Sequence, residues 1–181
     1  WRHLRFLLLF SPRWLFFYPG LFLVLMGLVV GAILLGGPVR LGSVSFDIHT
    51  FLIAALCIIV GMQSISFAII GRRFASRYGF IPRSGRHDGL LEALTLERVL
   101  LAAIVLMLVG FGALLSGLAE WSGTGFGSLD PSITMRPVIL ALTALVCGFQ
   151  LMMSGFMSSM INIPVAEGRV ADLLDPKPPT P

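Results

Sequence analysis

Charged side chains are scarce in this sequence, because only 12 % of its 181 residues are Asp, Glu, Lys or Arg. A typical soluble domain carries about 25 %. There are only two cysteines, which excludes a disulfide-rich secreted domain. Hydrophobic residues make up 56 % of the chain, so the composition excludes a soluble globular domain and predicts an integral membrane protein. Residue 1 is tryptophan, not methionine, and we therefore expect the chain to be part of a longer protein.

Four stretches contain no charged residue and reach the length of about 20 residues that crosses a bilayer. No stretch alternates apolar and polar residues as a membrane barrel requires, so each is predicted to be a helix. The first is too long for a signal peptide, and no small-residue cleavage site closely follows it. The predicted spans are Leu15–Leu35, Thr50–Gly71, Val99–Ala119 and Pro137–Ile163.

These spans predict an all-α integral membrane fold with three parts. Residues 1–13 form a juxtamembrane segment, whose basic and aromatic residues favour a short interfacial helix. Residues 14–163 form the four-helix transmembrane domain. Residues 164–181 are polar and rich in proline, and we expect them to be a disordered cytoplasmic tail.

The basic residues are distributed unevenly around the spans. Eleven Lys and Arg residues flank the spans on one side, whereas the two loops on the other side hold only Arg40 and Arg136. The positive-inside rule then predicts a multi-pass protein of the cell (inner or plasma) membrane with both termini cytoplasmic. No nucleic-acid partner is predicted, because the basic residues flank spans that contact membrane lipid.

The sequence repeats itself once. Residues 25–34 resemble residues 106–115 at an offset of 81, and Gly61-Met62-Gln63 resembles Gly148-Phe149-Gln150 at an offset of 87. This repeat predicts two tandem helical hairpins of the same orientation, with Gln63 and Gln150 in equivalent positions. The alternative is chance similarity between spans that are rich in Leu and Gly.

Polar groups inside the spans are few. No Asp, Glu, Lys, Arg or His lies in the middle of a span, which argues against a proton-coupled transporter. Gln63 and Gln150 are predicted to form hydrogen bonds between helices, which are worth about 1 kcal/mol each in lipid. Cys57 and Cys147 are predicted to be packing residues, since neither has a second metal ligand nearby in the sequence. No metal site and no catalytic residue are predicted.

Small residues recur at a spacing of four in two spans. Gly27 with Gly31, and Gly112 with Ser116, match the pattern that allows transmembrane helices to approach closely. The alternative is chance, because this spacing is common in spans that are rich in glycine.

Arginines gather at the predicted cytoplasmic boundary. Guanidinium groups bind phosphate in a bidentate way, so these residues predict a site for a lipid phosphate. The alternative is that they only set topology and contact anionic lipids in general. The residues are Arg5, Arg13, Arg72, Arg73 and Arg77.

Four segments resemble family 2 glycosyltransferases that act on polyisoprenyl phosphates, the dolichyl-phosphate mannose or glucose synthase-like enzymes. They are WRHLRFLLLFSPRWLFFYPG at the start, GRRFA at 71–75, LTLER at 94–98 and GFGSLDPS at 125–132. The resemblance covers nearly all of residues 1–164. It implies a membrane domain that anchors the enzyme and presents polyprenyl or dolichyl phosphate to a cytosolic catalytic domain.

In that family the catalytic domain transfers a sugar from a nucleotide sugar with the help of a divalent metal. The resemblance places its Mg or Mn site upstream, so no cofactor is expected within residues 1–181. Two alternatives stay open, a stand-alone four-helix transporter or flippase subunit and a structural membrane subunit. The sequence leaves open the sugar, the nucleotide, the lipid length and whether the protein forms a homo-oligomer.

Overall fold

Four long helices and one short β-hairpin make up the computed structural model, which describes residues 13–42, 44–77, 95–123 and 131–161. All four helices are long and apolar enough to cross a membrane, which confirms the predicted all-α integral membrane fold. The elements are a π-helical segment (Arg13–Phe17), α2 (Tyr18–Leu35), β1 (Val39–Leu41), β2 (Val44–Phe46), α3 (Ile48–Arg77), α5 (Leu96–Gly123) and α6 (Pro131–Ile161). The predicted interfacial helix and tail lie outside the described residues.

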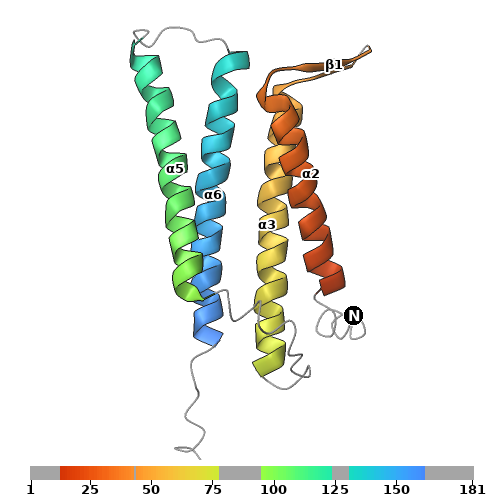
Figure 1. Ribbon diagram of the computed structural model, residues 1–181, viewed down its shortest axis with the longest axis vertical. Helices are drawn as coiled ribbons and strands as arrows, with labels where there is room; N and C mark the ends of the chain where they lie inside the picture. Colours follow the sequence, from red (N-terminus) through yellow and green to blue (C-terminus); the bar gives the residue numbers. More distant parts are fainter. Residues whose placement is uncertain (1–12, 43, 78–94, 124–130, 162–181) are drawn as a thin grey trace, which may run out of the picture.

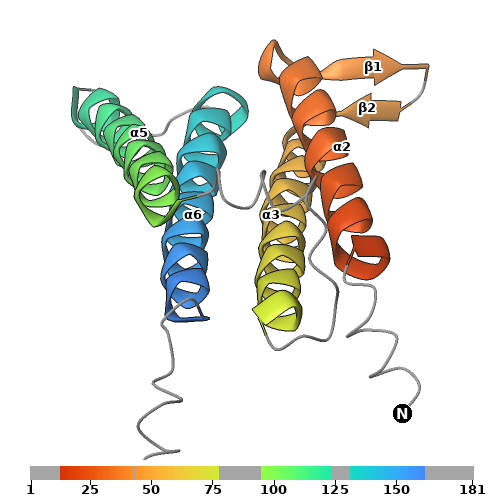
Figure 2. The same cartoon turned by 60° about the horizontal axis from the view of Figure 1, so that its bottom comes forward.

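The helices pack in the order α2, α3, α6, α5 (Figures 1 and 2). Each hairpin packs internally, α2 on α3 and α5 on α6, and the two hairpins meet through α3 and α6. In the most apolar 18-residue stretch of each helix, 28 % of the residues of α3 and of α6 are buried, whereas the value is 17 % for α2 and 11 % for α5. The inner pair is therefore α3 and α6, and these two helices run in the same direction (Figure 1).

Glycines set the close approach inside each hairpin. A Cβ atom added to Gly27 on α2 would lie 2.5 Å from the carbonyl oxygen of Ala54 on α3. In the second hairpin, a Cβ atom added to Gly110 on α5 would lie 2.7 Å from the carbonyl oxygen of Ala141 on α6. Contacts this short exclude any side chain unless the backbone shifts, so glycine lets the helix backbones touch.

The second helix of each hairpin also contributes a glycine to a close contact, and these two contacts are equivalent. A Cβ atom on Gly61 of α3 would lie 2.6 Å from the carbonyl oxygen of Gly20, and one on Gly148 of α6 would lie 2.9 Å from that of Ala103. Residues that the repeat makes equivalent therefore contact equivalent residues in the two hairpins. The tandem arrangement predicted from the sequence is confirmed at the level of individual contacts.

The contacts correct one register of the repeat. The second helices follow the predicted offset of 87, which relates Gly61 to Gly148. The predicted offset of 81 for the first helices is wrong, because the contacts relate Gly27 to Gly110, an offset of 83. Spans rich in Leu and Gly match one another at several offsets by letter alone, and only the packing partners distinguish them.

The small-residue pairs gave mixed outcomes. Gly27 packs closely, but Gly31 and Gly112 would each accept a Cβ atom with no neighbour within 4 Å. The Ser116 hydroxyl donates a hydrogen bond to the carbonyl oxygen of Ala113 in its own helix. The spacing therefore coincides with a close contact at Gly27 but not at Gly31 or Gly112, and the close-packed glycine of α5 is Gly110 instead.

Helix boundaries extend past the predicted spans. At about 1.5 Å per residue, the 30 residues of α3 reach about 45 Å, whereas the hydrocarbon core is about 30 Å thick. The helix α3 is therefore longer than the hydrocarbon core is thick. The last span begins at Pro131 instead of Pro137, and Pro137 lies inside α6. Membrane helices tolerate an internal proline because neighbouring groups satisfy the freed carbonyl.

Aromatic side chains mark both ends of the bundle. The rings of Trp14 and Tyr18, where α2 begins, are 4.9 Å apart, and Trp14 is 76 % exposed. Trp121 lies near the other end of the bundle, in the last turn of α5, and is also exposed. Tryptophan and tyrosine favour the two membrane–water interfaces, so these residues locate the bilayer around the four helices.

A short antiparallel hairpin, β1 with β2, follows α2 beyond the end of the bundle (Figure 1). Sequence analysis did not anticipate it. Its signals are alternating apolar residues on both sides of a glycine, and Gly42 has a φ of +60°, which fits a tight hairpin turn.

Candidate functional site

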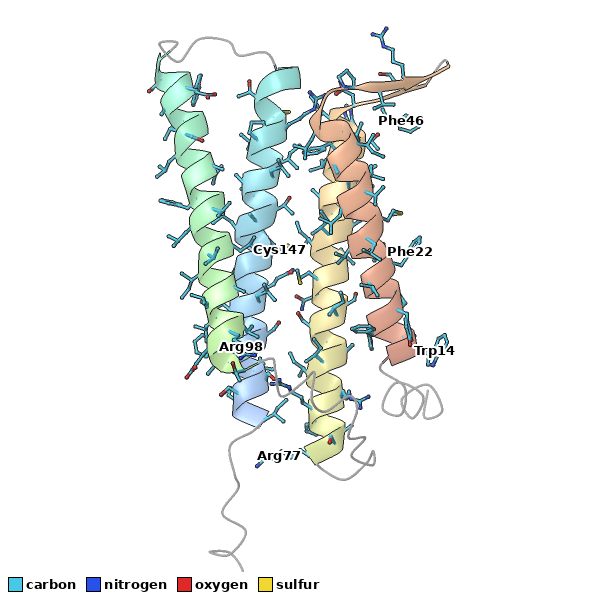
Figure 3. All side chains as sticks on the ribbon, viewed as in Figure 1. Trp14, Phe22, Phe46, Arg77, Arg98 and Cys147 are labelled. Atoms are coloured by element: carbon cyan, nitrogen blue, oxygen red, sulfur yellow. The ribbon has the colours of Figure 1, made fainter. Side chains whose placement is uncertain are left out.

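One end of the bundle is strongly basic. Figure 3 shows Arg77, Arg98 and Trp14 toward the lower end and Phe46 at the upper end. By position, the described charged residues of the lower end are five arginines and one glutamate, and those of the upper end are two arginines and two acids. We call the lower set the basic end. It contains Arg13, Arg72, Arg73, Arg77, Arg98 and Glu97.

The last turns of α3 bring most of the predicted arginines together. Arg73 and Arg77 are four residues apart and so share a face of the helix, whereas Arg72 is about 100° away. Arg72 and Arg73 are half-buried and Arg77 is exposed. Of the other predicted residues, Arg5 lies outside the described chain, and Arg13 is described only as the first residue of the π-helical segment.

Arg98 is a member of the basic end that the predicted site omitted. It is the third residue of α5 and is exposed. A signal was available in the sequence, because Arg98 directly precedes the uncharged third span on the same side as Arg72 and Arg73.

Arg73 contacts the second hairpin. Its Nη1 atom donates a hydrogen bond to the hydroxyl oxygen of Ser158, which lies on α6 and is only 7 % exposed. The bond joins residues 85 positions apart and crosses between the two inner helices. The basic end is thus anchored to both hairpins, and Ser158 is a site residue that sequence reasoning did not assign.

A second polar contact joins the inner helices at the opposite end. The Nη2 atom of Arg136 on α6 lies 2.7 Å from the Oδ1 atom of Asp47, and the Arg136 side chain is only 13 % exposed. The carbonyl oxygen of Asp47 also accepts a backbone hydrogen bond from the Phe51 amide at the start of α3. The tandem repeat was a signal for this ion pair, because it places the starts of α3 and α6 at the same end.

The predicted interhelical amides lie at equivalent positions of the repeat. Both follow the close-packed glycines Gly61 and Gly148 by two residues. The Oε1 atom of Gln150 is buried and has no hydrogen-bond partner within the described chain. Gln63 is half-buried. Cys147 is buried near the middle of α6, in agreement with a packing role (Figure 3).

The described residues offer groups that can bind an anion and lipid tails. Among them, no three His, Cys, Asp or Glu side chains gather as a metal site would require. The basic end supplies guanidinium donors at headgroup depth, suited to an anion such as phosphate. The large apolar side chains exposed along all four helices are suited to lipid tails.

Comparison with known proteins defines the class. The family described as the glycosyltransferase family 2 C-terminal transmembrane region matches residues 69–162. The chain therefore belongs to this family and is a glycosyltransferase membrane domain.

A curated relative is the low-salt glycan biosynthesis hexosyltransferase Agl6 of Haloferax volcanii, which is 30 % identical over 163 residues. The alignment covers 87 % of this chain but only 37 % of that protein, so the chain spans little more than a third of its relative. No solved structure matches.

Proposed function

We propose that this membrane domain holds a polyprenyl or dolichyl phosphate at its basic end, for a catalytic domain of the same protein. That domain transfers a sugar from a nucleotide sugar to the lipid phosphate, with Mg or Mn as its metal. The residues of the present chain bind and orient the acceptor and take no part in the chemical step.

The observation that carries the proposal is the placement of three arginines in the last turns of α3. These turns lie beyond the roughly 20 residues that cross the hydrocarbon core, so the guanidinium groups lie at the depth of a lipid phosphate. An isoprenoid tail stays in the bilayer, where it contacts the exposed apolar side chains of the helices. Membership in a glycosyltransferase family favours this function over a transporter or a structural subunit.

The proposal requires the basic end to face the cytoplasm, as the excess of arginine at this end favours. Thr95 precedes α5 at the basic end, and Ser45 lies in β2 at the opposite end. In a variant with Cys57 and Cys147 replaced by alanine, a membrane-impermeant maleimide added to intact cells should label Ser45→Cys and leave Thr95→Cys unlabelled. If Thr95→Cys is labelled and Ser45→Cys is not, the basic end faces the outside and the predicted orientation is wrong.

Binding measurements separate phosphate recognition from general lipid contact. The full-length protein in nanodiscs should bind polyprenyl phosphate about tenfold or more tightly than polyprenol of the same chain length, because charge-assisted hydrogen bonds to the phosphate are worth about 1.5–3 kcal/mol each. Arg77→Ala should reduce this preference, whereas Arg40→Ala at the opposite end should preserve it. If the two lipids bind equally, or if phosphatidylglycerol competes as well as polyprenyl phosphate does, the basic end has no specific site for the lipid phosphate and its arginines only set the topology.

A further inference from the structure

We infer that Ser158 is a positioning residue that orients the Arg73 guanidinium toward the lipid phosphate. The inference rests on the proposed function and deepens it. It is carried by a hydrogen bond that crosses between the hairpins at the basic end, from the Nη1 atom of Arg73 to the hydroxyl oxygen of Ser158.

Burial makes this bond an orienting one. The Ser158 side chain is buried in the packing of α6, so its hydroxyl is held in place, while Arg73 reaches it across the interface between hairpins. A long arginine side chain loses considerable rotamer freedom when it is fixed, at a cost of up to about 2 kcal/mol. If Ser158 fixes Arg73 before the lipid arrives, that cost does not reduce the affinity for the lipid.

The hydroxyl partner of Arg73 in this bond carries no charge. A hydroxyl is neutral, so Ser158 fixes one edge of the guanidinium plane without contributing a negative charge. The pair at the other end of the same two helices differs, because there the carboxylate of Asp47 binds Arg136 directly. Ser158 at the basic end is thus a neutral partner, whereas Asp47 at the opposite end is a negatively charged one.

The internal repeat does not reproduce the pair. At the offset of 87 that relates α3 to α6, Arg73 corresponds to Met160, and Ser158 corresponds to Gly71. The repeated glycine contacts thus occur in both hairpins, whereas the Arg73–Ser158 pair has no counterpart on the other side of the interface. This asymmetry suits a role in binding one ligand.

Steady-state kinetics of the full-length glycosyltransferase test the inference. Ser158→Ala should raise the KM for polyprenyl phosphate by about tenfold, the size expected for one lost hydrogen bond to a charged group. The kcat and the KM for the nucleotide sugar should be unchanged, and Ser158→Thr, which keeps the hydroxyl, should restore the acceptor KM. In an Arg73→Ala background, Ser158→Ala should have no further effect, because Ser158 acts through Arg73.

Two control variants separate positioning from a structural role. Ser159→Ala removes a neighbouring hydroxyl on another face of α6, and Asp47→Asn weakens the opposite end of the same helix interface. Both should keep the wild-type acceptor KM, and Asp47→Asn should lower the unfolding temperature. If Asp47→Asn raises the acceptor KM as much as Ser158→Ala does, Ser158 only holds the hairpins together and the inference is overturned.

The failure of the inference differs from the failure of the proposed function. If Arg73→Ala raises the acceptor KM and Ser158→Ala leaves it at the wild-type value, phosphate binding stands and the positioning role is overturned. If neither variant changes the acceptor KM, the binding role of Arg73 is overturned as well.

Discussion

Replacing Gly61 with leucine should prevent the first hairpin from packing as it does in the wild-type protein. Even a Cβ atom at this position would lie 2.6 Å from the carbonyl oxygen of Gly20 and 2.7 Å from the Cγ2 atom of Val24. One of these neighbours is backbone, so α2 must move away from α3. Overpacking typically costs 1–3 kcal/mol, and we expect a loss of about 3 kcal/mol here.

A matched substitution on the same hairpin gives the control. Gly31→Leu places the same side chain where a Cβ atom has no neighbour within 4 Å, so its unfolding temperature in nanodiscs should stay close to the wild-type value. The repeat adds a second expectation, that Gly148→Leu is as damaging as Gly61→Leu. Equal unfolding temperatures for Gly61→Leu and Gly31→Leu would contradict the close approach of α2 and α3.

The sequence predicted the spans well because transmembrane helices are defined by composition over about 20 residues. It placed Leu35 at the end of the first helix, as the structure does. It missed the last turns of α3, because the polar residues that extend this helix beyond the hydrocarbon have no hydrophobic signal. The predicted second span ended at Gly71, whereas α3 ends at Arg77.

Helix contacts were harder to predict than helices. The pattern of small residues marked Gly27, which packs closely, and equally Gly31, which has no neighbour within 4 Å. A glycine on a helix face reports that a close approach is allowed, and only the position of the neighbouring helix decides whether it occurs. The repeat was more informative, because it related Gly61 to Gly148 without any knowledge of their partners.

Only part of the candidate site could be predicted, because contacts between helices could not. Arg72, Arg73 and Arg77 could be grouped because they are close in sequence and lie at a membrane boundary. Ser158 could not be added, since it lies 85 residues from Arg73 and one serine among several in its span has no distinguishing signal. Contacts between hairpins depend on how α3 packs on α6, which the order of residues alone does not specify.

Removing both adjacent arginines of the basic end should have a large effect on function. Each guanidinium that binds the phosphate contributes about 1.5–3 kcal/mol, so Arg72→Ala with Arg73→Ala should lower kcat/KM for polyprenyl phosphate by about 100-fold. The KM for the nucleotide sugar should be nearly unchanged, because that substrate is expected to bind in the catalytic domain. Arg40→Ala, at the opposite end of the bundle, should behave as the wild-type enzyme.

The most direct measurement is therefore the dependence of sugar transfer on the concentration of polyprenyl phosphate, made with the full-length enzyme and with its Arg72→Ala/Arg73→Ala variant. Both proteins should have the same unfolding temperature in nanodiscs to within a few degrees. We predict a much higher acceptor KM for the variant, with an unchanged KM for the nucleotide sugar. Wild-type acceptor kinetics in the variant would contradict the claim that this membrane domain binds the lipid phosphate.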